Sequence, residues 1–229
     1  MNTARLVTAS LDDRFPLSRL PACLLVQSES MNPARRQQWR AGRALLAEAL
    51  FVFAGCEMLP AMQISPQGKP SFVDPSLPYF SLSHSKNCLQ LVLCAAGETG
   101  CDVEQMRPRL RYLDIARAAF SDTEFQWLLG HLDPQRAFWQ LWCLREAWLK
   151  QRGGSVWQMD RIRLDPAAGL FTSQPDSDSR LWSGASGAVM TAVAVPGGTE
   201  APEEYWFDVG SGLLISQARR VWTPFDIAL

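Results

Sequence analysis

The chain has 229 residues, of which 47% are hydrophobic and 20% are charged, a balance typical of a soluble globular protein with a full-sized core. Its formal net charge is −1, which excludes a global positive field for nucleic acid or for an anionic membrane surface. No stretch approaches the roughly 18 apolar residues of a membrane span, and the first residues lack a signal-peptide pattern, so we expect a cytoplasmic protein.

Cysteine and histidine usage argues against a structural zinc site. The six cysteines form no C-x-x-C pair, and the chain has only two histidines. Most of the cysteines stand inside apolar runs, which is typical of reduced thiols packed in a core.

The first half of the chain is predicted to form one long helix followed by strands. Asn32 suits a helix N-cap, Pro33 the first helical position and Gly55 the stop, so we expect a helix ending near residue 54. A turn-rich passage follows at residues 65–70. Strand patterns come next, at residues 79–83, 89–95 and 100–104.

The second half repeats this order of a main helix and then strands. Short helices are expected at residues 113–119 and from 123, and the main helix from 133 to about 153. Strand patterns follow at residues 161–164, 188–195 and 205–209. Segments rich in Pro, Gly, Ser and Asp predict loops at residues 173–187 and 196–204. The composition of elements therefore predicts an α+β fold, with the later strands antiparallel.

Asp102 and Glu104 stand two residues apart and alternate with apolar Cys101 and Val103. A period of two predicts a short, half-buried strand with both carboxylates on one face. Like charges this close repel unless a cation or a proton lies between them. The pair indicates either a metal and phosphate site or an edge strand with two solvated acids.

Glu146 and Lys150 stand four residues apart in the main helix of the second half, so they share a face. Both lie at the margin of a broad apolar face, and Arg145 lies near its centre. A partly buried acid and amine need assigned partners, which favours a functional site. The alternative is an ordinary surface Glu–Lys pair.

Three serines and a histidine stand at residues 81–85, at the end of the strand pattern at residues 79–83. Ser83 and His84 can offer a hydroxyl and an imidazole to an anion, or they can belong to an ordinary serine-rich turn. As strand neighbours they face opposite sides, so they are not a catalytic dyad.

Two arginine clusters complete the candidate residues. Arg36, Arg40 and Arg43 line one edge of the first long helix, where a solvated helix face is the alternative reading. Arginines at 107, 109 and 111 alternate, so they can project together as a patch for an acidic partner.

In this order, the segments resemble the surfactin-synthetase-type 4′-phosphopantetheinyl transferases. The family pattern G-x-D-[VI]-E stands at residues 100–104, and W-x-x-[KR]-E-[AS]-x-x-K stands at 142–150. A G-K-P turn at 68–70 and a Ser-His-Ser strand end at 83–85 precede them, and residues 42–46 also match. Residues 150–155 look most like the second holo-acyl-carrier-protein synthase of enteric bacteria.

The resemblance implies a pseudo-twofold monomer of two similar α+β halves, residues 1–104 and 105–229, each with a long helix packed on a small antiparallel sheet. It implies that coenzyme A binds in the cleft between the halves. The implied reaction transfers 4′-phosphopantetheine from coenzyme A to a serine of an apo acyl or peptidyl carrier protein and releases adenosine 3′,5′-bisphosphate. No nucleic acid and no membrane partner is expected.

The resemblance also implies roles for individual residues. Mg²⁺ on the pyrophosphate is expected to be held by Asp102, Glu104 and Glu146. Lys150 is expected to contact the phosphate under attack, and Glu146, directly or through a metal-bound water, is the candidate base. The 3′-phosphate and adenine end are expected to be held by Arg43, Lys69, Ser83 and His84. Where the family often has lysine, this chain has Arg145, which cannot act as a base.

A non-catalytic coenzyme A or carrier-protein binding module on the same fold is the rival interpretation. The intact set of Asp102, Glu104, Glu146 and Lys150 argues against it, because a pure binder needs no metal triad. A metal-dependent phosphodiesterase would need a site for a water nucleophile, which no motif here specifies.

Overall fold

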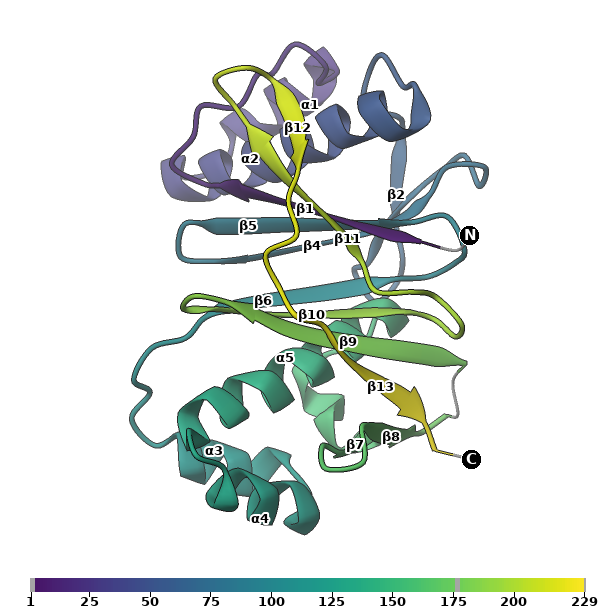
Figure 1. The fold of residues 1–229 in the computed structure, drawn as a ribbon. Helices are drawn as coiled ribbons and strands as arrows, with labels where there is room; N and C mark the ends of the chain where they lie inside the picture. The colour runs from purple at the N-terminus through teal and green to yellow at the C-terminus, as the bar shows by residue number, and fades with distance from the viewer. Residues whose placement is uncertain (1–2, 176–177, 229) are drawn as a thin grey trace.

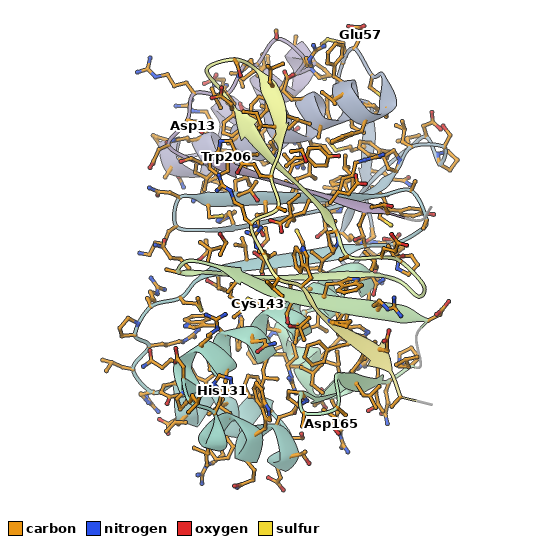
Figure 2. All side chains as sticks on the ribbon, viewed as in Figure 1. Asp13, Glu57, His131, Cys143, Asp165 and Trp206 are labelled. Carbon is orange, nitrogen blue, oxygen red and sulfur yellow. The ribbon has the colours of Figure 1, made fainter. Side chains whose placement is uncertain are left out.

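A computed structural model describes residues 3–175 and 178–228 as four layers, with two sheets stacked between two groups of helices (Figure 1). Helices and sheets are both prominent and most strand pairs are antiparallel, which confirms the predicted α+β class. Side chains fill the space between the layers (Figure 2). No helix in the described ranges is long and apolar enough to cross a bilayer.

The first sheet has the strand order β12-β11-β1-β5-β4. Its strands are β1 (Ala4–Ser10), β4 (Tyr79–Ser85), β5 (Cys88–Cys94), β11 (Glu203–Asp208) and β12 (Leu213–Ser216). Its outer face is covered by α1 (Ala22–Glu29) and α2 (Pro33–Ala54). The predicted bounds of α2 are confirmed: the Asn32 side chain accepts a hydrogen bond from Arg35 N, and Gly55 ends the helix with φ 69°.

The second sheet has the order β6-β10-β9-β13-β8-β7. Its strands are β6 (Gly100–Gln105), β7 (Ile162–Asp165), β8 (Leu170–Ser173), β9 (Ser179–Ser186), β10 (Val189–Pro196) and β13 (Thr223–Ile227). The helices below it are α3 (Tyr112–Ala119), α4 (Asp122–Gly130), α5 (Pro134–Arg152) and the short 3₁₀ helix η1 (Val156–Arg161). A separate hairpin is formed by β2 (Met62–Ile64) and β3 (Pro70–Phe72).

Side-chain alternation along the strands produces three cores. Odd-numbered leucines of β5, such as Leu91, pack under α2, whereas Val92 packs between the two sheets. On β10, Ala192 packs against α5, whereas Val193 faces the space between the sheets. Cys143, labelled in Figure 2, is fully buried where α5 meets the second sheet.

The two sheets exchange segments of the chain. β6, expected at the end of the first half, lies in the second sheet, and β11 returns to pair in parallel with β1. Such pairings join residues far apart in sequence, so local patterns do not reveal them. The division into domains at residue 104 and the pseudo-twofold relation stay predictions.

The loop predicted at residues 173–187 is wrong for most of its length, because residues 179–186 form β9. Its serines and glycine suggested a loop, but Leu181 and Ser183 are buried and the strand pairs with both β10 and β13. Pairing with two neighbouring strands and burial therefore make this segment a strand, in spite of its turn-like composition.

Gly100 sets the contact between β6 and α5. A β-carbon built at this position would lie 2.0 Å from Ala147 O and 2.4 Å from Gln151 N, both backbone atoms of α5. Only glycine therefore lets the helix cross the strand at this distance. The crossing brings the face of α5 that carries Glu146 and Lys150 onto β6.

We predict that Gly100→Ala lowers the free energy of unfolding by at least about 1–3 kcal/mol, because α5 must move to admit the methyl group. Gly130→Ala is the matched control, since nothing lies within 4 Å of its added β-carbon. Urea denaturation of both variants checks this. Equal stability of the two variants would show that α5 does not cross β6 this closely.

Candidate active site

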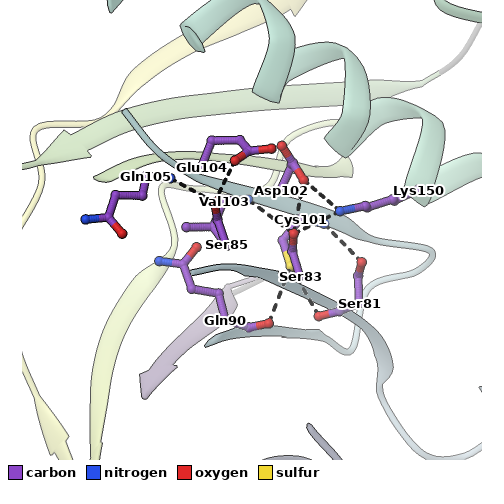
Figure 3. A network of polar contacts seen from close by, with 10 residues as sticks. All are labelled: Ser81, Ser83, Ser85, Gln90, Cys101, Asp102, Val103, Glu104, Gln105 and Lys150. Carbon is purple, nitrogen blue, oxygen red and sulfur yellow. Dashed lines mark hydrogen bonds and ion pairs between the residues drawn. The ribbon is translucent and has the colours of Figure 1, made fainter. Parts of the chain in front are cut away.

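Three serine hydroxyls of β4 line the open edge of β6, and we call Ser81, Ser83 and Ser85 the serine seam (Figure 3). Each hydroxyl oxygen accepts a hydrogen bond from a backbone N–H of β6. The donor–acceptor distances are 3.1 Å from Cys101 N, 3.3 Å from Val103 N and 3.1 Å from Gln105 N. Because β10 pairs with the other edge of β6, the seam satisfies the donors that the sheet leaves unpaired.

Two hydroxyls of the seam also hold the carboxylates of β6. Ser83 Oγ donates to Asp102 Oδ1 at 3.0 Å, and Ser85 Oγ donates to Glu104 Oε2 at 2.6 Å. Asp102 is buried and Glu104 is half-buried. β6 is therefore not an edge strand with two solvated acids, which was the alternative interpretation of this acid pair.

Lys150 reaches the seam from α5. Its Nζ donates to Asp102 Oδ1 at 2.7 Å and to Ser83 Oγ at 2.9 Å (Figure 3). Glu146 lies one turn earlier on the same helix and is half-buried. Lys150 of α5 and Asp102 of β6 are therefore in direct contact.

Negative charge is in excess at this point, because three carboxylates face one ammonium group. Burial, and then the charge of Asp102, raises the pKa of Glu146. Burial also raises the pKa of Glu104, in spite of its hydrogen bond from Ser85. For Lys150 burial alone would lower the pKa, but Asp102 and the other neighbouring charges outweigh it and raise the pKa.

The acids suit a hard divalent cation that is also bound by waters and substrate oxygens. They do not enclose a cation by themselves. Asp102 Oδ2 is buried and has no hydrogen-bond partner in the described residues. Within the same residues, no group of three His, Cys, Asp or Glu side chains converges closely enough to hold a metal ion alone. Mg²⁺ usually binds through one or two carboxylates, waters and substrate phosphates, so this donor set suits it.

A pocket of about 250 Å³ adjoins the acids and is lined by cationic residues. Arg43 from α2, Lys69 from the β2–β3 turn and Lys150 from α5 all contribute to its wall. Burial lowers the pKa of Arg43, and its guanidinium lies 5.1 Å from the centre of the Trp39 ring. Clustered positive charge in a pocket of this kind suits an anionic ligand.

The other two residues expected at the phosphate end are placed differently. Ser83 is a member of the seam, and its hydroxyl contacts protein groups. His84 is exposed and faces the same side of β4 as Leu82, which lines the pocket. Partial desolvation of the imidazole by its neighbours, and then the charge of Lys150, lowers the pKa of His84.

Arg145 points away from these groups. Its Nη2 lies 2.5 Å from Glu124 Oε1, both side chains are almost fully buried, and the guanidinium lies 4.5 Å from the Phe120 ring centre. Glu124 Oε1 also accepts from Leu164 N at 2.7 Å. Arg145 therefore joins α5 to α4 and β7, which explains an arginine inside an apolar face.

Sequence reasoning noted the three serines of β4 but not their contacts with β6, and it did not single out Glu124. The alternation of three serines on β4 is a signal for one polar strand face. Ser121 and Glu124 form a capping box at the start of α4, which is visible as a Ser-x-x-Glu spacing.

Comparisons with known proteins agree on one family. Residues 98–191 match the 4′-phosphopantetheinyl transferase superfamily. The chain is 38% identical over 163 residues to the 4′-phosphopantetheinyl transferase AcpT of Salmonella typhimurium, which covers 70% of this chain and 81% of that protein. It is 40% identical over 146 residues to AcpT of Escherichia coli strain K12, covering 62% and 71%. A putative 4′-phosphopantetheinyl transferase of Haemophilus influenzae is 26% identical over 193 residues.

We predict that Arg145→Met lowers the free energy of unfolding by about 3–5 kcal/mol, because it leaves the Glu124 carboxylate buried without a counter-charge. The double variant Arg145→Met/Glu124→Gln should recover a large part of this loss. Urea denaturation checks both, with the exposed Arg136→Met as control. A single variant as stable as the control would refute the structural role.

Proposed function

The chain belongs to the 4′-phosphopantetheinyl transferase superfamily, and on that basis we propose that it transfers 4′-phosphopantetheine from coenzyme A to a serine of an apo acyl or peptidyl carrier protein. Adenosine 3′,5′-bisphosphate would leave. The observation that carries this proposal is the meeting of Asp102, Glu146 and Lys150 beside a cationic pocket.

In the proposed reaction, the carrier serine oxygen bonds to the phosphorus that carries the pantetheine arm, and the bond from that phosphorus to the bisphosphate breaks. Lys150 would neutralise charge on the phosphate oxygens, which is the largest contribution that a side chain makes to such a transfer. Glu146, directly or through a water, would accept the serine proton. Its raised pKa, caused by burial and by Asp102, makes it a better base than a solvated glutamate.

Mg²⁺ would be held by Asp102, Glu104 and Glu146 only together with waters and the pyrophosphate oxygens, since no three acids of the described residues converge closely enough to hold a metal ion alone. The ion, when bound, would supply positive charge to the pyrophosphate oxygens. Arg43 and His84 would hold the 3′-phosphate end. All of these residues belong to one chain, which supports a monomer as the active unit.

The carrier protein is proposed to dock at the arginine run that follows β6. Arg107 and Arg111 are exposed, and the charge of Arg107 acts on Glu104. Arg109 instead lies 5.4 Å from the centre of the Trp142 ring, so its side chain covers an aromatic surface of α5. A cationic rim beside the acids suits an acidic partner whose serine has to reach Glu146.

The rival function, a non-catalytic binding module, does not explain why three carboxylates lie beside the cationic pocket. A binder of coenzyme A needs the cationic pocket but gains nothing from three carboxylates held beside the pyrophosphate. Burial, and then repulsion from Asp102, raises the pKa of Glu146; keeping these acids ionised costs stability, and a catalytic role explains this cost.

We predict that Glu146→Gln slows the transfer by about 10²–10⁴-fold, the range for loss of a general base. Asp102→Asn should also be strongly impaired. Mass spectrometry of an apo carrier protein incubated with coenzyme A, Mg²⁺ and enzyme measures the transfer, and the exposed Glu200→Gln is the control. A folded Glu146→Gln variant with the control's rate would sink the proposed role.

The lowered pKa of His84 gives a pH-dependent prediction for cofactor binding. Because this pKa lies below the usual 6.5, His84 is largely neutral at neutral pH in the free protein. A bound phosphate favours the imidazolium, so binding takes up a proton, and affinity for coenzyme A should rise as pH falls from about 8 to 6.5. Calorimetry should show that His84→Gln loses this slope. Identical slopes in both proteins would remove His84 from the phosphate site.

For carrier docking, we predict that Arg107→Glu/Arg111→Gln raises the KM for the carrier and flattens its salt dependence, because rim charges act mainly on association. The affinity for coenzyme A should not change. Arg163→Glu, exposed on β7, is the control. An unaltered carrier KM in the double variant would mean that docking occurs elsewhere.

A further inference from the structure

The ammonium group of Lys69 is surrounded by oxygen atoms of the protein. Its Nζ donates to Thr99 O at 3.1 Å and to Gln151 O at 2.7 Å, and it forms an ion pair with Glu98. A lysine ammonium has three protons to donate, so all three are in use. Only 15% of the side chain is exposed.

Of the three acceptors, Gln151 lies on α5, and Glu98 and Thr99 lie in the segment that leads into β6. Thr99 directly precedes β6, and Gln151 follows Lys150 in the last turn of α5. Carbonyls in the last turn of a helix have no partner within the helix and carry its negative end. Lys69 supplies the missing donor from the β2–β3 turn, a segment more than eighty residues away in the chain.

The end of α5 is fixed from other directions as well. The side-chain amide of Gln151 donates through Nε2 to Glu98 O at 2.9 Å and accepts at Oε1 from Ser179 Oγ at 3.0 Å. Gly153, with φ 68°, ends α5 next to the hairpin: a β-carbon built there would lie in ordinary van der Waals contact with Cβ of Lys69, at 3.6 Å. The tip of the hairpin therefore packs on the end of α5.

The same hairpin forms one wall of the cationic pocket, through Gln67, Gly68 and Pro70. We propose that Lys69 is a positioning residue, which holds this wall against α5 and fixes the place of Lys150, and that it does not bind a cofactor phosphate. The link to phosphopantetheine transfer rests on the proposed function.

The chemistry of lysine supports this assignment. To bind a phosphate, Lys69 would have to release Glu98, Thr99 O or Gln151 O, and release of either carbonyl would leave that carbonyl without this donor in a partly buried place. A compact ammonium can donate in three directions, whereas a planar guanidinium cannot reproduce them. The chain has only three lysines, and every other residue in its Lys and Arg total is arginine.

Hydrogen exchange of the full-length protein without cofactor tests the structural half of the proposal. In Lys69→Met, amides of the β2–β3 hairpin and of the last turn of α5 should exchange about tenfold faster or more, with the other helices unchanged. Lys86→Met, in the exposed β4–β5 turn, is the matched control. Exchange equal to that of the control would overturn the proposal.

Binding of coenzyme A and of dephospho-coenzyme A separates positioning from phosphate binding. Lys69→Met should weaken both cofactors by the same factor, about tenfold, so that the preference for coenzyme A is kept. Lys69→Arg should restore neither, and kcat should fall in both variants because Lys150 is displaced. Loss of the preference in Lys69→Met, with its return in Lys69→Arg, would make Lys69 a phosphate ligand and overturn the proposal. If the wild-type protein binds neither cofactor, the proposed function fails, while hydrogen exchange still decides the role of Lys69.

Discussion

The contact between the edge of β4 and the edge of β6 is the constraint on which the candidate site depends. Two edge strands with unpaired backbone groups meet there, and the serine seam satisfies the donors of one with the hydroxyls of the other. Because Ser83 and Ser85 also donate to Asp102 and Glu104, the contact that joins the sheets is the same contact that orients the acids. The three serines therefore join the two sheets, and two of them, Ser83 and Ser85, hold the acids in place.

The second half of the site follows from the way α5 lies on β6. Gly100 admits the helix at a distance that no β-carbon allows, and the crossing puts Lys150 on Asp102 and Ser83. The three carboxylates and one ammonium group at this crossing carry more negative than positive charge and are partly shielded from water. A site of this kind attracts cations, and burial and repulsion raise the pKa values of Glu104 and Glu146.

Much of this arrangement could be predicted from the sequence, because it rests on short-range patterns. The alternation around Asp102 predicted its strand, and the spacing of Glu146 and Lys150 predicted their shared helix face. The sequence could not predict which strand pairs with β1 or which residue pairs with Arg145, because these contacts join residues that are distant in the chain. The sequence also could not show which side chains already have partners. Lys69 therefore looked like a free cation, although its ammonium group donates to protein oxygens.

The most direct test of the account measures backbone hydrogen exchange and phosphopantetheine transfer together in Ser81→Ala, Ser83→Ala and Ser85→Ala. Each variant should lose protection at its own partner amide: Cys101, Val103 and Gln105, in that order. Transfer should slow in Ser83→Ala and Ser85→Ala, whose hydroxyls hold the acids, and remain close to wild type in Ser81→Ala. Unchanged protection at all three amides, or an equal loss of transfer in all three variants, would contradict the account.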